Sequence, residues 1–458
     1  MRPCCLLAVA FGLSLSALLP GKAAAADFVR DEVIVKYRPG IGNLARGHLQ
    51  SGAGTSNGAK LPGGARRLKI GDGKSVAATI AELERSSLVE YAVPNHLARA
   101  STFFPNDRGF GAVGEWPSAQ WNFFGPAGVN APEAWDLARA AGAPGGAGVR
   151  VAVLDTGVAY SSRDGFRRAP DLYPNRFVPG YDFVDEDPHP NDEFGSDRRQ
   201  QYGHGTHVTG TIAQRTNNGH GVTGLAYGAR IMPLRVLNAD GLGDAAAIAR
   251  AIRFAADRDV RVINMSFEFD SSVSRREIPD VLSAIRYAHH RGVVMVAAAG
   301  NHFEARAATV PVAYPARTHY VISVGATTER LCQSEYTNGG SALDLVAPGG
   351  GSDAPWADNP RDAANCKPGA PGRYIYQQTF TSSVRNFGLP GGFEGTSMAC
   401  PHVSGAAALL IASGRLGPSP TPLAVERRLK ATARDLGPIG RDARYGAGLL
   451  DAAAALRP

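Results

Sequence analysis

Three short segments of the chain carry side chains that together could activate a serine hydroxyl as a nucleophile. Asp155 ends the apolar run VRVAVLD, His204 opens the segment HGTHVTG, and Ser397 lies in GTSMACPHVSG. A serine hydroxyl is a poor nucleophile at neutral pH, so it needs a base such as histidine within hydrogen-bond reach. The histidine in turn needs a buried carboxylate that holds its ring in one tautomer. The three residue types therefore predict nucleophilic catalysis by Ser397.

The elements that must bring these side chains together are read from the hydrophobic pattern. Two segments, 244–257 and 279–291, repeat apolar residues at helical spacing between short apolar runs. The runs rich in strand-forming residues are 149–155, 229–237, 260–266, 292–300, 320–326 and 342–349. Continuous apolar strands that alternate with helices predict a parallel sheet covered on both faces. Functional groups in such sheets gather just beyond the carboxyl ends of the strands, which is where Asp155 lies.

The three motifs, in the order Asp, His, Ser, resemble those of the subtilisin-like serine proteases (subtilases) over about residues 110–456. The resemblance implies an α/β fold of three layers with a central parallel sheet, and peptide-bond hydrolysis through an acyl-enzyme. It assigns Ser397 as the nucleophile, His204 as the general base and acid, and Asp155 as the residue that orients His204. A helix start beneath Ser397 and the side chain of Asn301 would stabilise the oxyanion.

The resemblance also implies a substrate cleft between two strand ends. The residues expected along it are Ser266, Phe267, Glu268, Ala298, Ala299 and Gly300. The family usually has glycines after the serine, where this chain has Phe267 and Glu268. A carboxylate at that position could charge the cleft and favour basic substrate side chains. The alternative is a solvated loop carboxylate.

Calcium is the expected cofactor, and no organic cofactor is expected. One candidate loop carries three carboxylates, Asp182, Asp185 and Asp187, which repel one another unless a hard cation with oxygen ligands lies among them. The alternative is a solvated acidic loop. A second loop, 214–222, resembles a tighter calcium site of the family. Its implied ligands are the Asn218 side chain, carbonyls from about Thr216, His220 and Val222, and Asp164 as a distal carboxylate, with Asp171 competing for that role.

Two segments precede the predicted peptidase domain, which is residues 101–458. Residues 1–26 combine Arg2, an apolar stretch over 6–19 and small residues up to Ala26, the pattern of a secretory signal peptide. Its apolar stretch is too short to span a bilayer, so we expect an exported chain without a membrane anchor. Residues 27–100 predict a small β-α-β unit, with strands at 33–37 and 89–93, a helix at 77–84 and a loop over 40–64. The resemblance implies that this unit is a propeptide that aids folding and inhibits the enzyme, with removal somewhere around residues 95–115.

Charge and cysteine content narrow the class of partner. The formal net charge is +7, but the first 100 residues carry 13 basic and 7 acidic side chains, and the rest carry 35 and 34. The later part therefore shows no bias towards nucleic acid or membrane. Cys332 and Cys366 lie in loop-like segments and could pair, whereas Cys400 falls on an apolar helix and is expected to be buried.

We therefore predict a monomeric, secreted, self-processing endopeptidase that acts on polypeptides. Two alternatives stay open at this point. One is a processing protease with a narrow target, and the other is a catalytically inactive subtilase fold used for binding.

Overall fold

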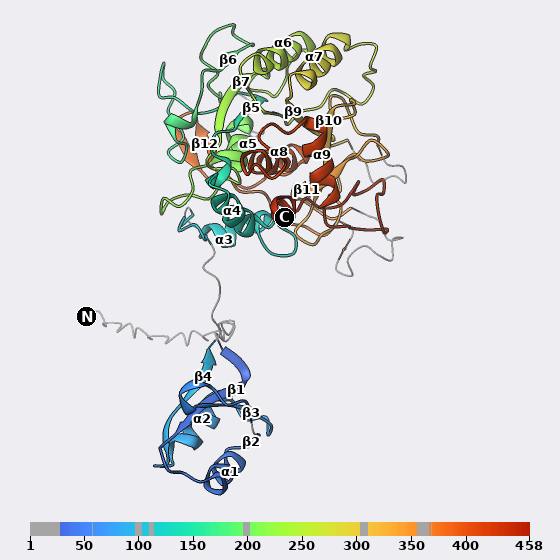
Figure 1. Cartoon of the computed structure of the whole chain (residues 1–458). Coiled ribbons are helices and arrows are strands. Elements are labelled where there is room, and N and C mark those ends of the chain that lie inside the picture. The colour runs from blue at the N-terminus through green and yellow to red at the C-terminus, as the bar shows by residue number, and fades with distance from the viewer. Residues whose placement is uncertain are drawn as a thin grey trace, which may run out of the picture. The chain divides into compact units, whose positions relative to one another are not determined.

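The computed structural model describes residues 28–56, 58–96, 103–109, 114–195, 202–302, 310–354, 366–367 and 369–458. The predicted signal peptide lies outside these residues. The chain divides into two compact units, Met1–Ser101 and Thr102–Pro458 (Figure 1). This division falls one residue from the predicted boundary at residue 100. Within the described ranges, no helix has the length and apolar character needed to cross a bilayer.

The first unit is a four-stranded antiparallel sheet in the order β2-β3-β1-β4. Its elements are β1 (Phe28–Tyr37), α1 (Asn43–Gly52), β2 (Thr55–Ser56), β3 (Arg66–Ile70), α2 (Val76–Glu84) and β4 (Val89–His96). Val33 and Val35 of β1 are fully buried with Leu68 of β3 and Leu83 of α2. The core of this unit therefore consists of one sheet face and its helices.

The sequence predicted two of these strands and the second helix but missed α1, β2 and β3. Helix α1 lies inside the stretch 40–64 that its glycines and serines marked as a loop, and it begins after Gly42 with no side-chain cap. Strand β3 alternates exposed Arg67 and Lys69 with buried Leu68 and Ile70, so only one face of the strand is apolar. It is held by pairing with β1, with Leu68 opposite Val33. The unit therefore has more of its own core than a β-α-β piece would.

The second unit is built on a seven-stranded parallel sheet in the order β11-β10-β9-β8-β5-β7-β6. The strands are β5 (Arg150–Asp155), β6 (Tyr181–Asp182), β7 (Arg230–Arg235), β8 (Val262–Met265), β9 (Val294–Ala298), β10 (Val321–Thr327) and β11 (Leu345–Pro348). All six predicted strand segments form strands of this sheet. The two-residue β6 was not predicted, and neither was the hairpin of β12 (Thr379–Ser383) and β13 (Asn386–Gly388).

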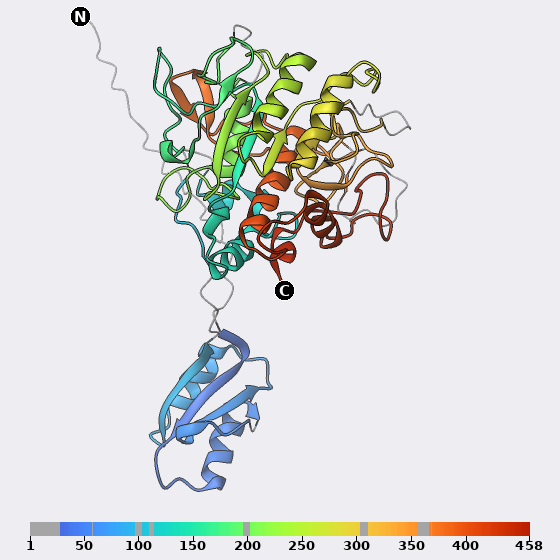
Figure 2. The same cartoon turned by 45° about the horizontal axis from the view of Figure 1, so that its top comes forward.

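Helices cover both faces of this sheet, as predicted. Alternate residues of β5 serve the two faces, since Val151 and Val153 belong to one buried cluster and Ala152 and Leu154 to the other. The helices α6 (Ala245–Ala256) and α7 (Pro279–His290), which match the predicted helical segments, lie side by side on one face (Figures 1 and 2). The opposite face contacts α4 (Ala131–Ala140), α5 (His204–Ala213), α8 (Thr396–Ala412), α9 (Pro422–Ala431) and α10 (Ala452–Leu456). A short helix, α3 (Trp116–Ala119), precedes α4.

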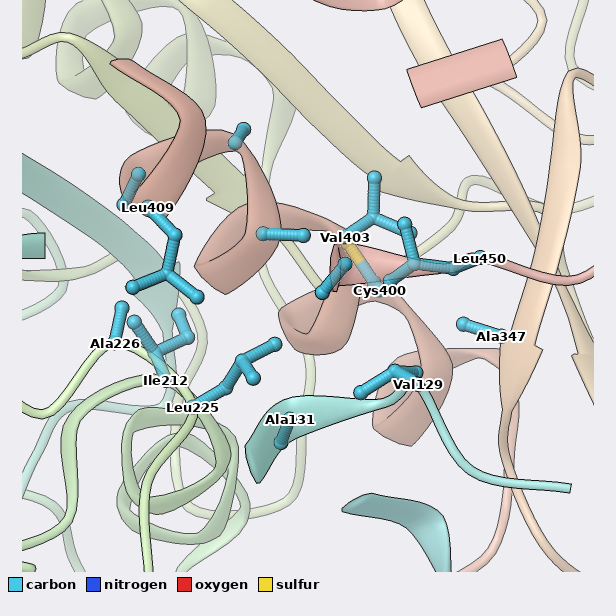
Figure 3. Close-up of a cluster of buried hydrophobic side chains, with 14 of the residues drawn as sticks. Val129, Ala131, Ile212, Leu225, Ala226, Ala347, Cys400, Val403, Leu409 and Leu450 are labelled. Atoms are coloured by element: carbon cyan, nitrogen blue, oxygen red, sulfur yellow. The ribbon is translucent and has the colours of Figure 1, made fainter. Parts of the chain in front are cut away.

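Helix α8 is the buried centre of that layer. Nearly every residue from Thr396 to Ile411 is buried, and a helix that is apolar all round is stable only inside a core. Figure 3 shows Val403 and Leu409 of this helix among Val129, Ile212 and Leu225 from other elements. Packing on all sides fixes the first turn of α8, which carries Ser397.

The cysteines behave as the sequence predicted. Cys332 and Cys366 form a disulfide with their Cα atoms 5.7 Å apart. Cys400 is free and fully buried in α8. The disulfide closes a loop far along the chain from the motifs that carry the chemistry.

Candidate functional site

Three element ends meet at the carboxyl edge of the sheet and place the predicted catalytic side chains. Asp155 is the last residue of β5, His204 is the first residue of α5, and Ser397 is the second residue of α8. His204 and Ser397 line one cleft of about 260 Å³. The turn before α5 requires glycine, because Gly203 has φ of 79° and a Cβ there would collide with the Thr379 hydroxyl.

Asp155 and His204 are in direct contact. Asp155 is fully buried, and its Oδ1 lies 2.7 Å from Nδ1 of His204. The same oxygen accepts the backbone N–H of Thr156 at 2.8 Å. Because Nδ1 faces a carboxylate, it carries the ring proton, which leaves Nε2 free to accept one. Burial alone would lower the pKa of His204, but the charge and hydrogen bond of Asp155 outweigh it and raise that pKa above its ordinary value.

The hydroxyl of Ser397 is held by Ser266 rather than by His204. Ser397 Oγ donates to the carbonyl oxygen of Ser266 at 2.9 Å, and Ser266 Oγ donates to the carbonyl oxygen of Ser397, also at 2.9 Å. These reciprocal bonds tie the first turn of α8 to the end of β8. Ser397 and His204 thus line the same cleft, and the Ser397 hydroxyl is bonded to Ser266 in this structure.

The amide of Asn301 is oriented by the turn that precedes Ser397. Its Oδ1 accepts the backbone N–H of Thr396 at 2.8 Å and the Thr396 hydroxyl at 2.9 Å. With the amide oxygen engaged in this way, the Nδ2 group is left as a donor. Asn301 also lines the cleft, so its donor is available to a carbonyl oxygen bound near Ser397.

Four of the six predicted substrate-binding residues line the cleft: Ser266, Phe267, Glu268 and Ala298. The other two, Ala299 and Gly300, are buried and are not part of the described lining. Gly300 donates its N–H to the Thr396 hydroxyl at 3.2 Å, so it supports the turn before Ser397. The structure therefore brings most of the predicted wall to the cleft surface.

Asp192 is a site residue that the sequence did not single out. Its carboxylate is fully buried and accepts the hydroxyl of Thr156 at 2.9 Å, the N–H of Glu193 at 3.0 Å, and the N–H and hydroxyl of Thr206 at 2.9 and 2.6 Å. The Thr156 hydroxyl in turn accepts the N–H of Gly205 at 2.9 Å. Asp192 thus joins the residue after Asp155 to the first turn of α5. It lies in a loop-like acidic stretch with no pattern that marks it as different from its neighbours.

The negative charge of Asp192 also acts on the histidine. Burial raises the pKa of Asp192 to about 7, although the donors around it act in the opposite direction. Its charge adds to that of Asp155 in raising the pKa of His204. Asp192 therefore affects both the position and the protonation of His204.

At the predicted calcium loop of Asp182, Asp185 and Asp187, two of the carboxylates pair with the side chain of Arg235. Nη1 of Arg235 lies 2.8 Å from Asp182 and also binds Asp185, and its Nη2 binds Glu193 at 2.6 Å. Arg235 is 3% exposed and is the last residue of β7, and nothing in the sequence marked it as the partner of this loop. Asp187 accepts the N–H of His189 instead. Because Arg235 binds two of the three loop carboxylates, it reduces their mutual repulsion without a calcium ion.

At the second predicted calcium loop, the structure corrects the distal carboxylate. Asp164 is an exposed residue whose side chain pairs with Arg163 at 3.0 Å. Asp171 is fully buried and accepts Nδ2 of Asn218 at 2.6 Å, so the carboxylate that contacts this loop is Asp171 and not Asp164. Thr216 and Val222 are buried in the same loop, and the N–H of His220 bonds to Asn218 Oδ1 at 2.9 Å.

A second carboxylate, Asp107, also reaches this loop and was missed. It is 2% exposed and accepts the N–H groups of Asn217 and Asn218 at 2.8 and 2.9 Å. Burial raises the pKa of Asp107, and burial together with the nearby charge of Asp107 raises the pKa of Asp171 to about 7. No sequence signal links residue 107 to a loop more than a hundred positions away. Among the described residues, no group of three or more His, Cys, Asp or Glu side chains is placed to hold a metal ion.

Comparison with known proteins decides the family. The profile of the subtilase family (peptidase S8) matches residues 146–448, which is more than half of the chain. The chain belongs to the subtilase family. A second profile, the fervidolysin N-terminal prodomain, matches residues 19–95. The chain is thus a subtilisin-family serine protease with an N-terminal prodomain.

Individual relatives of this subtilase support the same family assignment. It is 32% identical to a thermophilic serine proteinase of Bacillus sp. (strain AK1), over 92% of this chain and 86% of that protein. It is 34% identical to thermitase of Thermoactinomyces vulgaris, over 64% of this chain and 83% of that protein. A solved protease structure from Pseudoalteromonas arctica PAMC 21717 superimposes with a TM-score of 0.58 at 31% identity, covering 77% of this chain and 98% of the other. The predicted subtilisin-like α/β fold is therefore confirmed.

The contacts of Asp192 lead to a first prediction. In Asp192→Asn the amide places an NH2 group against donors, so the link between β5 and α5 is lost and His204 is held less firmly. We expect kcat for a peptide substrate to fall by about 10- to 100-fold, the cost of a small misplacement of a catalytic group. Loss of the negative charge should also lower the pKa of His204 and move the acid limb of the kcat/KM profile to lower pH.

The neighbouring variant Glu193→Gln serves as the matched control, because Glu193 binds Arg235 and its side chain does not contact α5. Melting temperatures show whether both variants fold. If kcat/KM of Asp192→Asn falls by the same factor at every pH, Asp192 has only a structural role.

Proposed function

We propose that this subtilase is a secreted, self-processing serine endopeptidase that forms an acyl-enzyme on Ser397. The observation that carries the proposal is the contact between a buried Asp155 and His204 in the cleft that also holds Ser397 and the free amide donor of Asn301. Each group that amide hydrolysis requires is present within one cleft. This is also the reason to favour a catalyst over an inactive binding protein.

In the proposed reaction, Ser397 first turns its hydroxyl from the Ser266 carbonyl towards Nε2 of His204. Oγ then attacks the carbonyl carbon of the scissile bond while Nε2 takes the hydroxyl proton. The imidazolium that forms is stabilised by Asp155, which already raises the pKa of His204 in the resting enzyme. His204 returns the proton to the leaving amine, and water attacks the acyl-enzyme by the same route.

The tetrahedral intermediate carries a negative oxygen that needs donors already in place. We assign Nδ2 of Asn301 and the backbone N–H of Ser397 to this role. Thr396 supports the assignment, because its two bonds to Asn301 Oδ1 hold the amide in the donating orientation. The start of α8 adds the positive end of a long, buried helix.

The prodomain is proposed as an inhibitor that the enzyme removes. Tyr91 and Val93 of β4 are alternate residues, and they expose 37% and 39% of their surface. Alternate residues of a strand point to the same face, so these apolar side chains mark a sheet face suited to cover another surface.

Secretion through the predicted signal peptide is supported by the name of a relative. One relative of this chain is named the extracellular protease of Xanthomonas campestris.

Replacing the nucleophile tests catalysis and self-processing together. Ser397→Ala removes the attacking oxygen, so we expect no hydrolysis of a denatured protein and a product that keeps residues 27 to about 100. The measurement is the intact mass of the product from a host that lacks other proteases. Ser341→Ala, which changes an exposed serine, should mature normally. Complete trimming of the Ser397→Ala chain would show that another protease removes the prodomain.

Asn301→Ala tests the oxyanion assignment. Loss of one preorganised donor should reduce kcat by about 10²–10³ while leaving KM nearly unchanged, because the donor acts mainly in the transition state. Steady-state kinetics on a peptide substrate measure both constants. An effect confined to KM would assign Asn301 to ground-state binding instead.

We also propose a structural calcium ion at the loop 214–222. Asp107 and Asp171 fit such an ion, because both carboxylates are buried and both accept hydrogen bonds from Asn218. Burial and the charge of Asp107 raise the pKa of Asp171. Oxygen donors of this kind suit a hard cation. Gly221 completes the fit, since any side chain there would collide with the carboxylate of Asp171. A bound cation would offset the repulsion between the two carboxylates and hold the segment around Asp107 to the loop.

Thermal melting with calcium and with a chelator tests this site. A ligand at a hundred times its dissociation constant stabilises the folded state by about 2.7 kcal/mol, so the two melting curves should separate by several degrees. The pKa of Asp171 is raised to about 7, so without calcium its ionisation destabilises the fold as pH rises from about 4 through 7. The separation should therefore be larger at pH 8 than at pH 5.

Asp107→Asn and Asp171→Asn should reduce that separation, whereas Asp164→Asn is the matched control and should retain it. Asp164 has a positive φ of 49°, a conformation that asparagine tolerates well. Curves that superimpose with calcium and with chelator at both pH values would rule out the site.

A further inference from the structure

The described lining of the cleft around Ser397 carries more negative than positive charge. Its lining includes two carboxylates, Asp240 and Glu268, together with the neutral or weakly basic His204. No lysine or arginine belongs to its described lining. Apolar parts of the wall come from Leu237, Phe267 and Ala298, so the cleft offers both apolar surface and negative charge.

The two carboxylates approach the cleft from different loops. Glu268 follows β8, and Asp240 lies in the loop after β7. In the sheet, β5 lies between β8 and β7. Asp155 ends β5, so the two acidic loops rise on either side of the strand that supports His204. A substrate that reaches Ser397 must therefore lie close to at least one of them.

Asp240 is a free acceptor. It is exposed, and among the described residues no hydrogen bond or ion pair engages its carboxylate. Its backbone is held in place, because Asn238 Oδ1 accepts the N–H groups of Asp240 and Leu242 at 3.0 and 2.9 Å. Gly241, with φ of 77°, allows the tight turn that follows. The loop thus presents an unpaired negative charge at a fixed place.

Glu268 is a partly engaged acceptor. Its Oε1 accepts the N–H of Asn301 at 3.0 Å, and its Oε2 lies 2.9 Å from Nδ1 of His302. A carboxylate has about four acceptor positions, so two remain for a ligand. Its side chain is 19% exposed, and burial raises its pKa, which a cation from a substrate would reverse. Glu268 therefore gains from a bound positive charge.

We propose that this cleft selects polypeptides that carry arginine or lysine beside the scissile bond, with Glu268 and Asp240 as the specificity-determining residues. The inference rests on the proposed peptidase activity and adds its substrate class. Apolar wall surface suits the aliphatic part of an arginine or lysine side chain, whose charged end then reaches a carboxylate. Arginine should be preferred to lysine, since its planar guanidinium can donate two bonds to one carboxylate.

The test compares peptides that differ only in the residue before the scissile bond, which is arginine, leucine or glutamate. The wild-type enzyme should cleave the arginine peptide best and the glutamate peptide worst. Glu268→Gln should reduce the ratio of kcat/KM for arginine over leucine by about tenfold, the effect of a partly buried charge. Asp240→Asn should reduce it by about threefold, as expected for an exposed charge, and high salt should weaken this effect.

Two features keep the test decisive. Asp259→Asn is the matched control, because Asp259 is 92% exposed, lies outside the described lining and has a φ that asparagine tolerates. Asp240→Asn changes an exposed loop side chain, so it reports on specificity even if Glu268→Gln folds poorly. Efficient cleavage with equal rates for arginine and leucine, unchanged in both variants, would overturn this inference alone. A wild-type enzyme that cleaves none of the peptides would overturn the proposed peptidase function as well.

Discussion

A carboxylate held out of water at the end of β5 is the interaction on which the site depends. An unpaired buried charge costs several kcal/mol, so Asp155 is tolerated only because His204 and the N–H of Thr156 meet it. That requirement fixes where α5 begins. Asp192 adds a second buried carboxylate that binds the residues on both sides of this contact. The hydrogen bonds of buried Asp192 thus hold the residues next to the contact between buried Asp155 and His204.

The nucleophile is placed by a different kind of constraint. Helix α8 is surrounded by apolar side chains along almost its whole length, so its first turn cannot shift without disturbing the core. Ser397 inherits that rigidity in its backbone, and its reciprocal hydrogen bonds with Ser266 tie the same turn to the end of β8. The main chain that carries Ser397 is therefore held both by apolar packing and by hydrogen bonds.

Much of this arrangement could be predicted from the sequence, because it depends on local patterns. The sheet strands are continuous apolar runs, and the motifs around Asp155, His204 and Ser397 lie at element ends with glycine turns. What could not be predicted depends on contacts between distant residues. Arg235 binds carboxylates of a loop some fifty positions before it, and Asp107 accepts hydrogen bonds from a loop more than a hundred positions after it. Helix α1 was missed because glycine-rich composition indicates a loop when no cap or apolar stripe opposes it.

The segment around Asp107 limits where the mature chain can begin. Phe103 donates its N–H to Asp136 at 2.7 Å, and Pro105 accepts the indole N–H of Trp116 at 2.6 Å, so residues 103–107 are part of the second unit. A cut after Asp107 would discard one of the two carboxylates at the loop 214–222 and expose the aromatic cluster beneath Phe103. If the prodomain is removed as proposed, a cut that keeps these contacts lies upstream of Phe103, so the N-terminal residue of the product would report whether processing has preserved the fold.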